Sequence, residues 1–141
     1  MRYCIPLLIC VSLVALLSCA SSPPTYTADM TPEDYLQMAQ ERADRGEYQI
    51  AIDVYYKMKE TFPNNLEKNI WASYEIAFLY HKMGNDAKSL ELLDELLTLY
   101  SQDQRNVLPK APKILAEQVK SNIENKGQYD NKLAPTPSPI R

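Results

Sequence analysis

The chain has 141 residues, a length typical of one domain, and it is 45% hydrophobic and 23% charged, as globular proteins usually are. A single histidine and three glycines exclude a multi-histidine metal site and a glycine-rich phosphate loop. The formal net charge of −3 disfavours binding to nucleic acid phosphates. We therefore expect no metal, no cofactor and no nucleic-acid partner.

The N-terminus has the features of a secretion signal. Arg2 supplies a positive charge, and the residues that follow it, 3–17, form an uncharged and largely apolar run. This run is shorter than the stretch of about 20 residues that a transmembrane helix needs. All three cysteines lie at or before Cys19, which argues against a disulfide framework in the folded part.

The apolar run ends in Leu16-Leu17-Ser18-Cys19, which resembles the lipobox of bacterial lipoproteins. The resemblance implies removal of a signal peptide, residues 1–18, and attachment of lipid to the Cys19 thiolate. Two or three acyl chains such as palmitate would anchor the protein stably, whereas one chain binds membranes only marginally. Ala20 in place of an aspartate implies the outer membrane, facing the periplasm, by the sorting rule of enteric lipoproteins. An ordinary signal peptide and an uncleaved anchor are the alternatives.

The rest of the chain is predicted to be helical. The small, polar and proline-containing residues after Cys19 predict a flexible tether over 19–30. Only helical signals follow, so an all-α domain is expected over residues 31–126. Its five predicted helices cover residues 32–45, 48–62, 68–83, 86–100, and 112 to just before Gly127. The proline-rich tail, residues 127–141, is predicted to be disordered.

The chain matches itself at an offset of 38 residues, the separation of Gly46 and Gly84. Both copies have the order helix, glycine turn, helix. The other matched pairs are Met38 and Ile76, Ala39 and Ala77, Ala51 and Ser89, Tyr55 and Leu93, Met58 and Leu96, and Phe62 and Tyr100. The repeat predicts two similar helix hairpins, and the last helix is expected to cap the second.

The first copy resembles a tetratricopeptide repeat through Tyr35-x-x-Met38-Ala39, Gly46-x-Tyr48-x-x-Ala51-Ile52-x-x-Tyr55-x-x-Met58 and Pro63-Asn64-Asn65. The resemblance implies two such hairpins, with alanines where helices cross and a concave binding face lined by the first helix of each hairpin. The second copy departs from the pattern at Ser89 and Ser101, and the period exceeds the usual length of about 34 residues. Repeats behind a lipobox resemble the BamD-type lipoproteins of outer-membrane barrel assembly, although those carry longer arrays.

The third predicted helix carries a second apolar stripe, formed by Trp71, Tyr74, Phe78 and His81 at spacings of 3, 4 and 3 residues. By the geometry of the resembled family this stripe would face the groove. There the three aromatic residues would anchor a partner segment, and His81 and Lys82 would form a polar rim. The alternative is that the helix is covered on both sides and the stripe is core. On the equivalent face, the first copy offers an acidic edge of Glu33, Leu36, Gln40 and Asp44.

No catalytic residue is predicted, because the sequence has no nucleophile with a base, no paired-carboxylate motif and no cofactor fingerprint. We therefore expect a lipid-anchored scaffold, not an enzyme, that binds envelope proteins, with outer-membrane assembly components as candidates. The alternative is a generic periplasmic adaptor, similar to the repeat domain of a division coordinator or associated with transport. Because two repeats bury a modest core, homodimerisation through an exposed helix would cover the remaining apolar surface.

Overall fold

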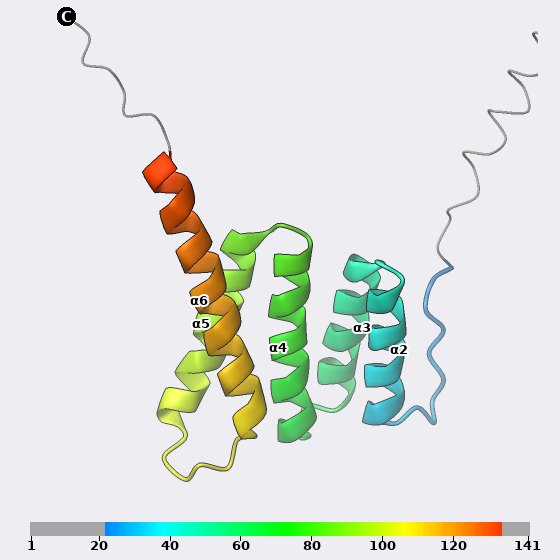
Figure 1. Cartoon of the computed structure of the whole chain (residues 1–141). Coiled ribbons are helices and arrows are strands. Elements are labelled where there is room, and N and C mark those ends of the chain that lie inside the picture. The colour runs from blue at the N-terminus through cyan, green and yellow to red at the C-terminus, as the bar shows by residue number, and fades with distance from the viewer. Residues whose placement is uncertain (1–21, 134–141) are drawn as a thin grey trace, which may run out of the picture.

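A computed structural model describes residues 22–133, with side chains described as far as Lys126. Its helices are α2 (Pro32–Asp44), α3 (Tyr48–Thr61), α4 (Leu66–Lys82), α5 (Asp86–Gln102) and α6 (Lys110–Leu133). Figure 1 shows two helix hairpins, α2–α3 and α4–α5, followed by the single helix α6. No strand occurs within residues 22–133. The predicted all-α fold built from helix hairpins is therefore confirmed.

The turns of the two hairpins have the same geometry, 38 residues apart. Gly46 and Gly84 adopt φ angles of 76° and 77°. In the first turn the N–H of Gly46 donates to the carbonyl of Ala43, and the N–H of Glu47 donates to that of Arg42, both at 2.9 Å. The same two bonds recur in the second turn. This Schellman arrangement favours glycine because L side chains are strained at positive φ.

Asparagine side chains cap the N-termini of both helices of the second hairpin. The Asn65 side chain accepts a hydrogen bond from the N–H of Lys68 at 3.2 Å, and the Asn85 side chain accepts one from the N–H of Lys88 at 3.1 Å. Each bond satisfies a backbone donor that the first turn of a helix leaves free. Because Asn65 acts as the N-cap, α4 begins at Leu66, two residues before its predicted start.

Helix α6 is longer than predicted at both ends. It begins at Lys110 and continues through Gly127 to Leu133, whereas the sequence predicts an end before Gly127 and disorder from there on. A glycine lowers helix stability by about 1 kcal/mol but does not end a helix, and the next proline is Pro135. Residues 134–141 lie outside the described part. No helix within residues 22–133 combines the length and apolar character needed to cross a bilayer.

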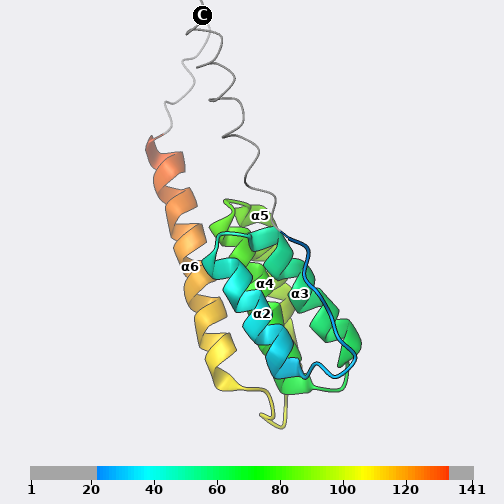
Figure 2. The same ribbon diagram turned by 90° about the vertical axis from the view of Figure 1, so that its right-hand side faces the viewer.

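Residues 22–30, called the N-terminal strap below, also differ from the prediction. The sequence predicts a flexible tether over residues 19–30, but the strap lies along the first hairpin (Figure 2). The ring of Tyr26 stacks on that of Tyr35 in α2, with centroids 5.5 Å apart, and Met30 packs against the core cluster that contains Tyr35. The stacking of Tyr26, which stays 38% exposed, and the partial burial of Met30 hold a segment that is otherwise polar.

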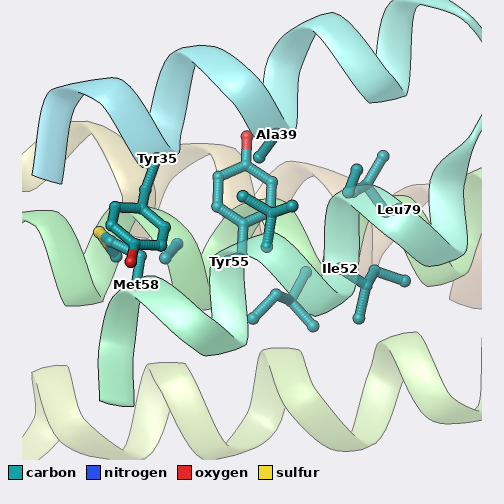
Figure 3. Close-up of a cluster of buried hydrophobic side chains, with 10 residues drawn as sticks. Tyr35, Ala39, Ile52, Tyr55, Met58 and Leu79 are labelled. Carbon is teal, nitrogen blue, oxygen red and sulfur yellow. The ribbon is translucent and has the colours of Figure 1, made fainter. Parts of the chain in front are cut away.

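The core consists of two hydrophobic clusters that meet on α4. The first lies among α2, α3 and α4, and Figure 3 shows its side chains. The second lies among α4, α5 and α6 and includes Ala77, Leu93 and Ala116. Ala39 and Ala51, predicted to lie where two helices cross, are completely buried. Helix α4 therefore supplies side chains to both clusters, and α6 covers the second, as expected of a cap.

Ser89 provides a test of the repeat. It takes the place in the second hairpin that Ala51 has in the first, both residues are 0% exposed, and the Ser89 hydroxyl has no hydrogen-bond partner among the described residues. We expect Ser89→Ala to raise the free energy of unfolding by about 1 kcal/mol, because it removes an unpaired buried hydroxyl. Urea denaturation measures this change. Ala51→Ser should lower stability, and a loss of stability in Ser89→Ala would contradict the prediction.

Candidate functional site: the groove between α2 and α4

Two adjoining hollows lie between α2 and α4, with volumes of about 340 and 270 Å³. Gln40 of α2, Tyr55 of α3 and Glu75 of α4 line both, so the hollows form one continuous groove. Figure 3 shows the ring of Tyr55 rising from α3 with its hydroxyl beside Ala39 of α2. The first hollow is also lined by Ala43, Asp44, Tyr48, Phe78, Leu79 and Lys82. The second is also lined by Leu36, Lys68 and Trp71.

Helix α4 presents one regular face to this groove. The residues that line it from α4 are spaced by three, four or one residues along the helix and so lie on one side: Lys68, Trp71, Glu75, Phe78, Leu79 and Lys82. Of the five predicted partner-binding residues, the structure places Trp71, Phe78 and Lys82 in the groove. From α2, the predicted edge contributes Leu36, Gln40 and Asp44.

Tyr74 belongs to the core and not to the groove. Its side chain is 7% exposed and forms part of the second cluster, with residues of α5 and α6. It stacks on Phe78 with ring centroids 6.0 Å apart and meets Trp71 edge-on at 6.4 Å. The stripe of the sequence analysis is therefore divided: Tyr74 is core, and half-buried Trp71 and Phe78 pack against the second cluster while also lining the groove.

His81 lies outside both hollows. Its Nδ1 contacts the Oδ1 of Asp86, in the first turn of α5, and its ring lies 6.5 Å from that of Phe78. This contact joins the end of α4 to the start of α5 across the glycine turn. The position fits a role in holding the second hairpin together and does not give His81 a place on the rim of the groove.

Glu75 is the functional candidate that the sequence reasoning missed. It is half-buried at the point that both hollows share, and no described residue gives its carboxylate a hydrogen bond or an ion pair. Desolvation raises the pKa of Glu75 above its ordinary value. Burial raises the pKa of the Tyr55 hydroxyl, and the nearby carboxylates of Glu75 and Asp44 raise it further. The groove therefore holds two neighbouring acids around a tyrosine hydroxyl.

Another half-buried charged group, Lys59, has a partner inside the protein. Its ammonium donates to the Ser73 hydroxyl at 2.6 Å, and that hydroxyl donates to the carbonyl of Asn69 at 2.9 Å. This chain of bonds joins α3 to α4 beside a hollow of about 180 Å³ that faces α5. Burial lowers the pKa of Lys59. Glu75 differs because it lines the groove and has no such bond to any described residue.

Comparisons with known proteins do not add to this picture. No protein-family model, no curated protein and no solved structure matches the chain. Within the part of the chain whose side chains are described, no group of three or more His, Cys, Asp or Glu residues could hold a metal ion. Cys19, the predicted lipidation site, lies outside the described residues. What the groove can bind therefore follows from its own side chains.

We expect Glu75→Gln to stabilise the protein at pH 7. Since burial raises the pKa of Glu75, the folded state holds its proton more tightly than the unfolded state, whose carboxyl titrates near 4.5. The stability of the wild type therefore falls as pH rises from 4.5 through the higher folded pKa. The urea midpoint of Glu75→Gln should exceed that of the wild type at pH 7, and the difference should disappear below about pH 4.

The matched control is Glu67→Gln, which removes one charge from an exposed position in the first turn of the same helix. This control should show no comparable gain in the urea midpoint between pH 4 and pH 7. A lower midpoint for Glu75→Gln at pH 7 would show that the carboxylate has a stabilising partner in the free protein.

Proposed function

We propose that the protein is a lipid-anchored scaffold of the bacterial cell envelope that holds a segment of a partner protein between α2 and α4. The observation that carries the proposal is the groove, in which the half-buried aromatic rings of Trp71 and Phe78 flank Glu75, a carboxylate that pairs with no described residue. Concave sites with aromatic anchors and few polar groups are typical of recognition surfaces. The lipobox at Cys19 and the tetratricopeptide-like sequence pattern support the envelope setting. Its action is binding and not catalysis.

The N-terminal strap fits an anchored protein. Tyr26, which contacts α2, lies seven positions after Cys19, so an extended link between them spans at most about 25 Å. A lipid on Cys19 would therefore keep the first hairpin close to the bilayer. Partners that reach the groove would be membrane proteins or proteins held near the membrane.

The identity of the partner has two candidate classes. Ala20 after the lipobox and the BamD-type resemblance favour an outer-membrane assembly component. The short array favours the second class, a generic periplasmic adaptor for a division or transport system. Two hairpins closed by α6 offer one groove for one short segment, whereas assembly lipoproteins present longer arrays.

Homodimerisation stays a prediction, and the structure offers an exposed apolar patch through which it would occur. The second cluster does not need a partner copy, because α6 covers it. The exposed apolar side chains Leu66 and Leu99, 51% and 48% exposed, border a separate hollow with Leu108. If two copies associate, this patch is one place where apolar surface is left to bury.

The anchor is tested by Cys19→Ser. We expect the wild type to incorporate radiolabelled palmitate and to sediment with the membrane fraction, because acyl chains hold it there. Cys19→Ser should lose both the label and the sedimentation. Cys4→Ser, within the signal segment, is the matched control and should retain both. Membrane association of Cys19→Ser without label would contradict lipid anchoring at this residue.

The groove is tested by crosslinking in native membranes. Wild type should crosslink to an envelope protein, and Trp71→Ala/Phe78→Ala should lose most of that product, because truncation of interface anchors typically weakens binding by 2 kcal/mol or more, about thirtyfold. Gln40→Trp fills the groove from the exposed face of α2 and avoids the risk to folding. Tyr56→Ala, an exposed aromatic residue outside the groove, is the control.

Circular dichroism first establishes that each variant is folded. If the double variant unfolds, the result for Gln40→Trp decides. Unchanged crosslinking of folded Gln40→Trp would exclude the groove as the binding site. An outer-membrane assembly component in the product would favour the first partner class, and a division or transport protein would favour the second.

A further inference from the structure

We infer that the groove selects a partner segment carrying a lysine or arginine side chain, whose cationic group binds the carboxylate of Glu75. This inference rests on the proposed function and specifies the chemistry of the partner. The starting point is the position of Glu75, which borders both hollows and is half-buried. A partly desolvated carboxylate is unfavourable unless a cation or hydrogen-bond donors compensate it. Among the described residues none does so.

Within the part of the chain whose side chains are described, the cations nearest the groove are engaged elsewhere or lie at its rim. Lys68, at one end of the groove, pairs with Glu33 of α2 at 3.2 Å. Arg42, on α2, pairs with Glu47 at 2.8 Å. Lys82 borders the first hollow but is exposed and forms no ion pair with Glu75. The negative charge in the middle of the groove is therefore left for a partner.

The aromatic walls of the groove suit the aliphatic part of a lysine or arginine side chain. Trp71 precedes Glu75 by one helical turn and lines the second hollow, while Phe78 follows it and lines the first. Aliphatic stems of lysine and arginine pack well on such rings, and their charged groups are attracted to aromatic faces. Asp44, in the first hollow, adds a second carboxylate with no ion pair in the described part of the chain.

Charge complementarity therefore distinguishes this groove from one that binds a purely apolar segment. Asp44 and Glu75 line the same hollow as Tyr55, and the charges of both carboxylates raise the pKa of its hydroxyl. An acidic partner segment would be repelled by both carboxylates, and an apolar one would leave them uncompensated. A basic side chain between the aromatic walls satisfies the carboxylates and covers the rings at the same time.

The test selects peptides from a random twelve-residue display library on the full-length protein in detergent. We expect the selected peptides to share a lysine or arginine. A synthetic selected peptide is then compared with its citrulline or norleucine version, which removes the charge, by fluorescence polarisation. Removal of the charge should weaken binding to the wild type at least about tenfold, as for hydrogen bonds to charged groups.

Variants of the protein assign the effect to one carboxylate. Glu75→Gln should weaken binding of the charged peptide at least about tenfold and remove most of the difference between charged and neutral peptides, as expected if the two groups interact directly. Glu67→Gln, with the same loss of charge on the same helix, should bind as the wild type does. Both variants are first checked for folding by circular dichroism.

Five results would overturn the inference, and they differ in what they say of the proposed function. If selected peptides share no basic residue, or if the neutral peptide binds equally well, the inference fails while the groove remains a binding site. If Glu67→Gln weakens binding as much as Glu75→Gln, the effect is one of net charge and not of Glu75. If no peptide is selected, or if Gln40→Trp binds peptides as the wild type does, the proposed groove and the inference fail together.

Discussion

Helix α4 packs against neighbours on two opposite sides, and the rest of the architecture depends on this constraint. Ala72, Ile76 and Leu79 contribute to the cluster with α2 and α3, while Ile70 and Tyr74 contribute to the cluster with α5 and α6. A helix buried on both sides has little surface left to face solvent. In this protein the residues of α4 at the border of the two clusters, on the side of α2, form a wall of the groove.

Both ends of the hairpin array are covered, whereas the groove between α2 and α4 stays open. Side chains of the N-terminal strap cover part of the first hairpin, and α6 covers the second. Each cover supplies apolar area that two isolated hairpins lack, since a repeat unit cannot bury its faces alone. The space between α2 and α4 is bordered by bulky and charged side chains of both helices, while the small residues Ala39 and Ala72 are buried in the first cluster below. Close packing is thus achieved below the groove and not within it.

Much of the fold is predictable because local chemistry decides it. Gly46 and Gly84 mark two turns that require positive φ, and Ala39 and Ala51 mark a close crossing of helices. Other features depend on contacts distant in sequence. The attachment of the strap depends on Tyr26 meeting Tyr35, and nothing in the polar segment itself signals that contact. The continuation of α6 past Gly127 reflects the small size of the glycine penalty against a helix that is already formed.

The candidate site was only partly predictable for a related reason. The sequence shows that α4 is apolar on two faces, but it does not show which side α6 occupies. Because α6 packs on the side of α4 that carries Tyr74, Tyr74 belongs to the core, whereas Trp71 and Phe78 also line the groove. One signal was available: Glu75 is the only charged residue within residues 70–80. Burying a lone carboxylate in an apolar helix is unfavourable, so its presence there indicates a candidate binding residue.

The position of Glu75 also relates stability to recognition. A carboxylate held in a partly desolvated groove lowers the stability of the free protein, and in the proposed complex the binding of a cation would offset this loss. The groove is small, so a single basic side chain between two rings provides limited affinity in solution. In the proposed anchored state that limit matters less, because confinement near a membrane raises the effective concentration of a partner held there. The short link between Cys19 and the strap would therefore compensate for a weak site, because it would hold the groove near partners in the membrane.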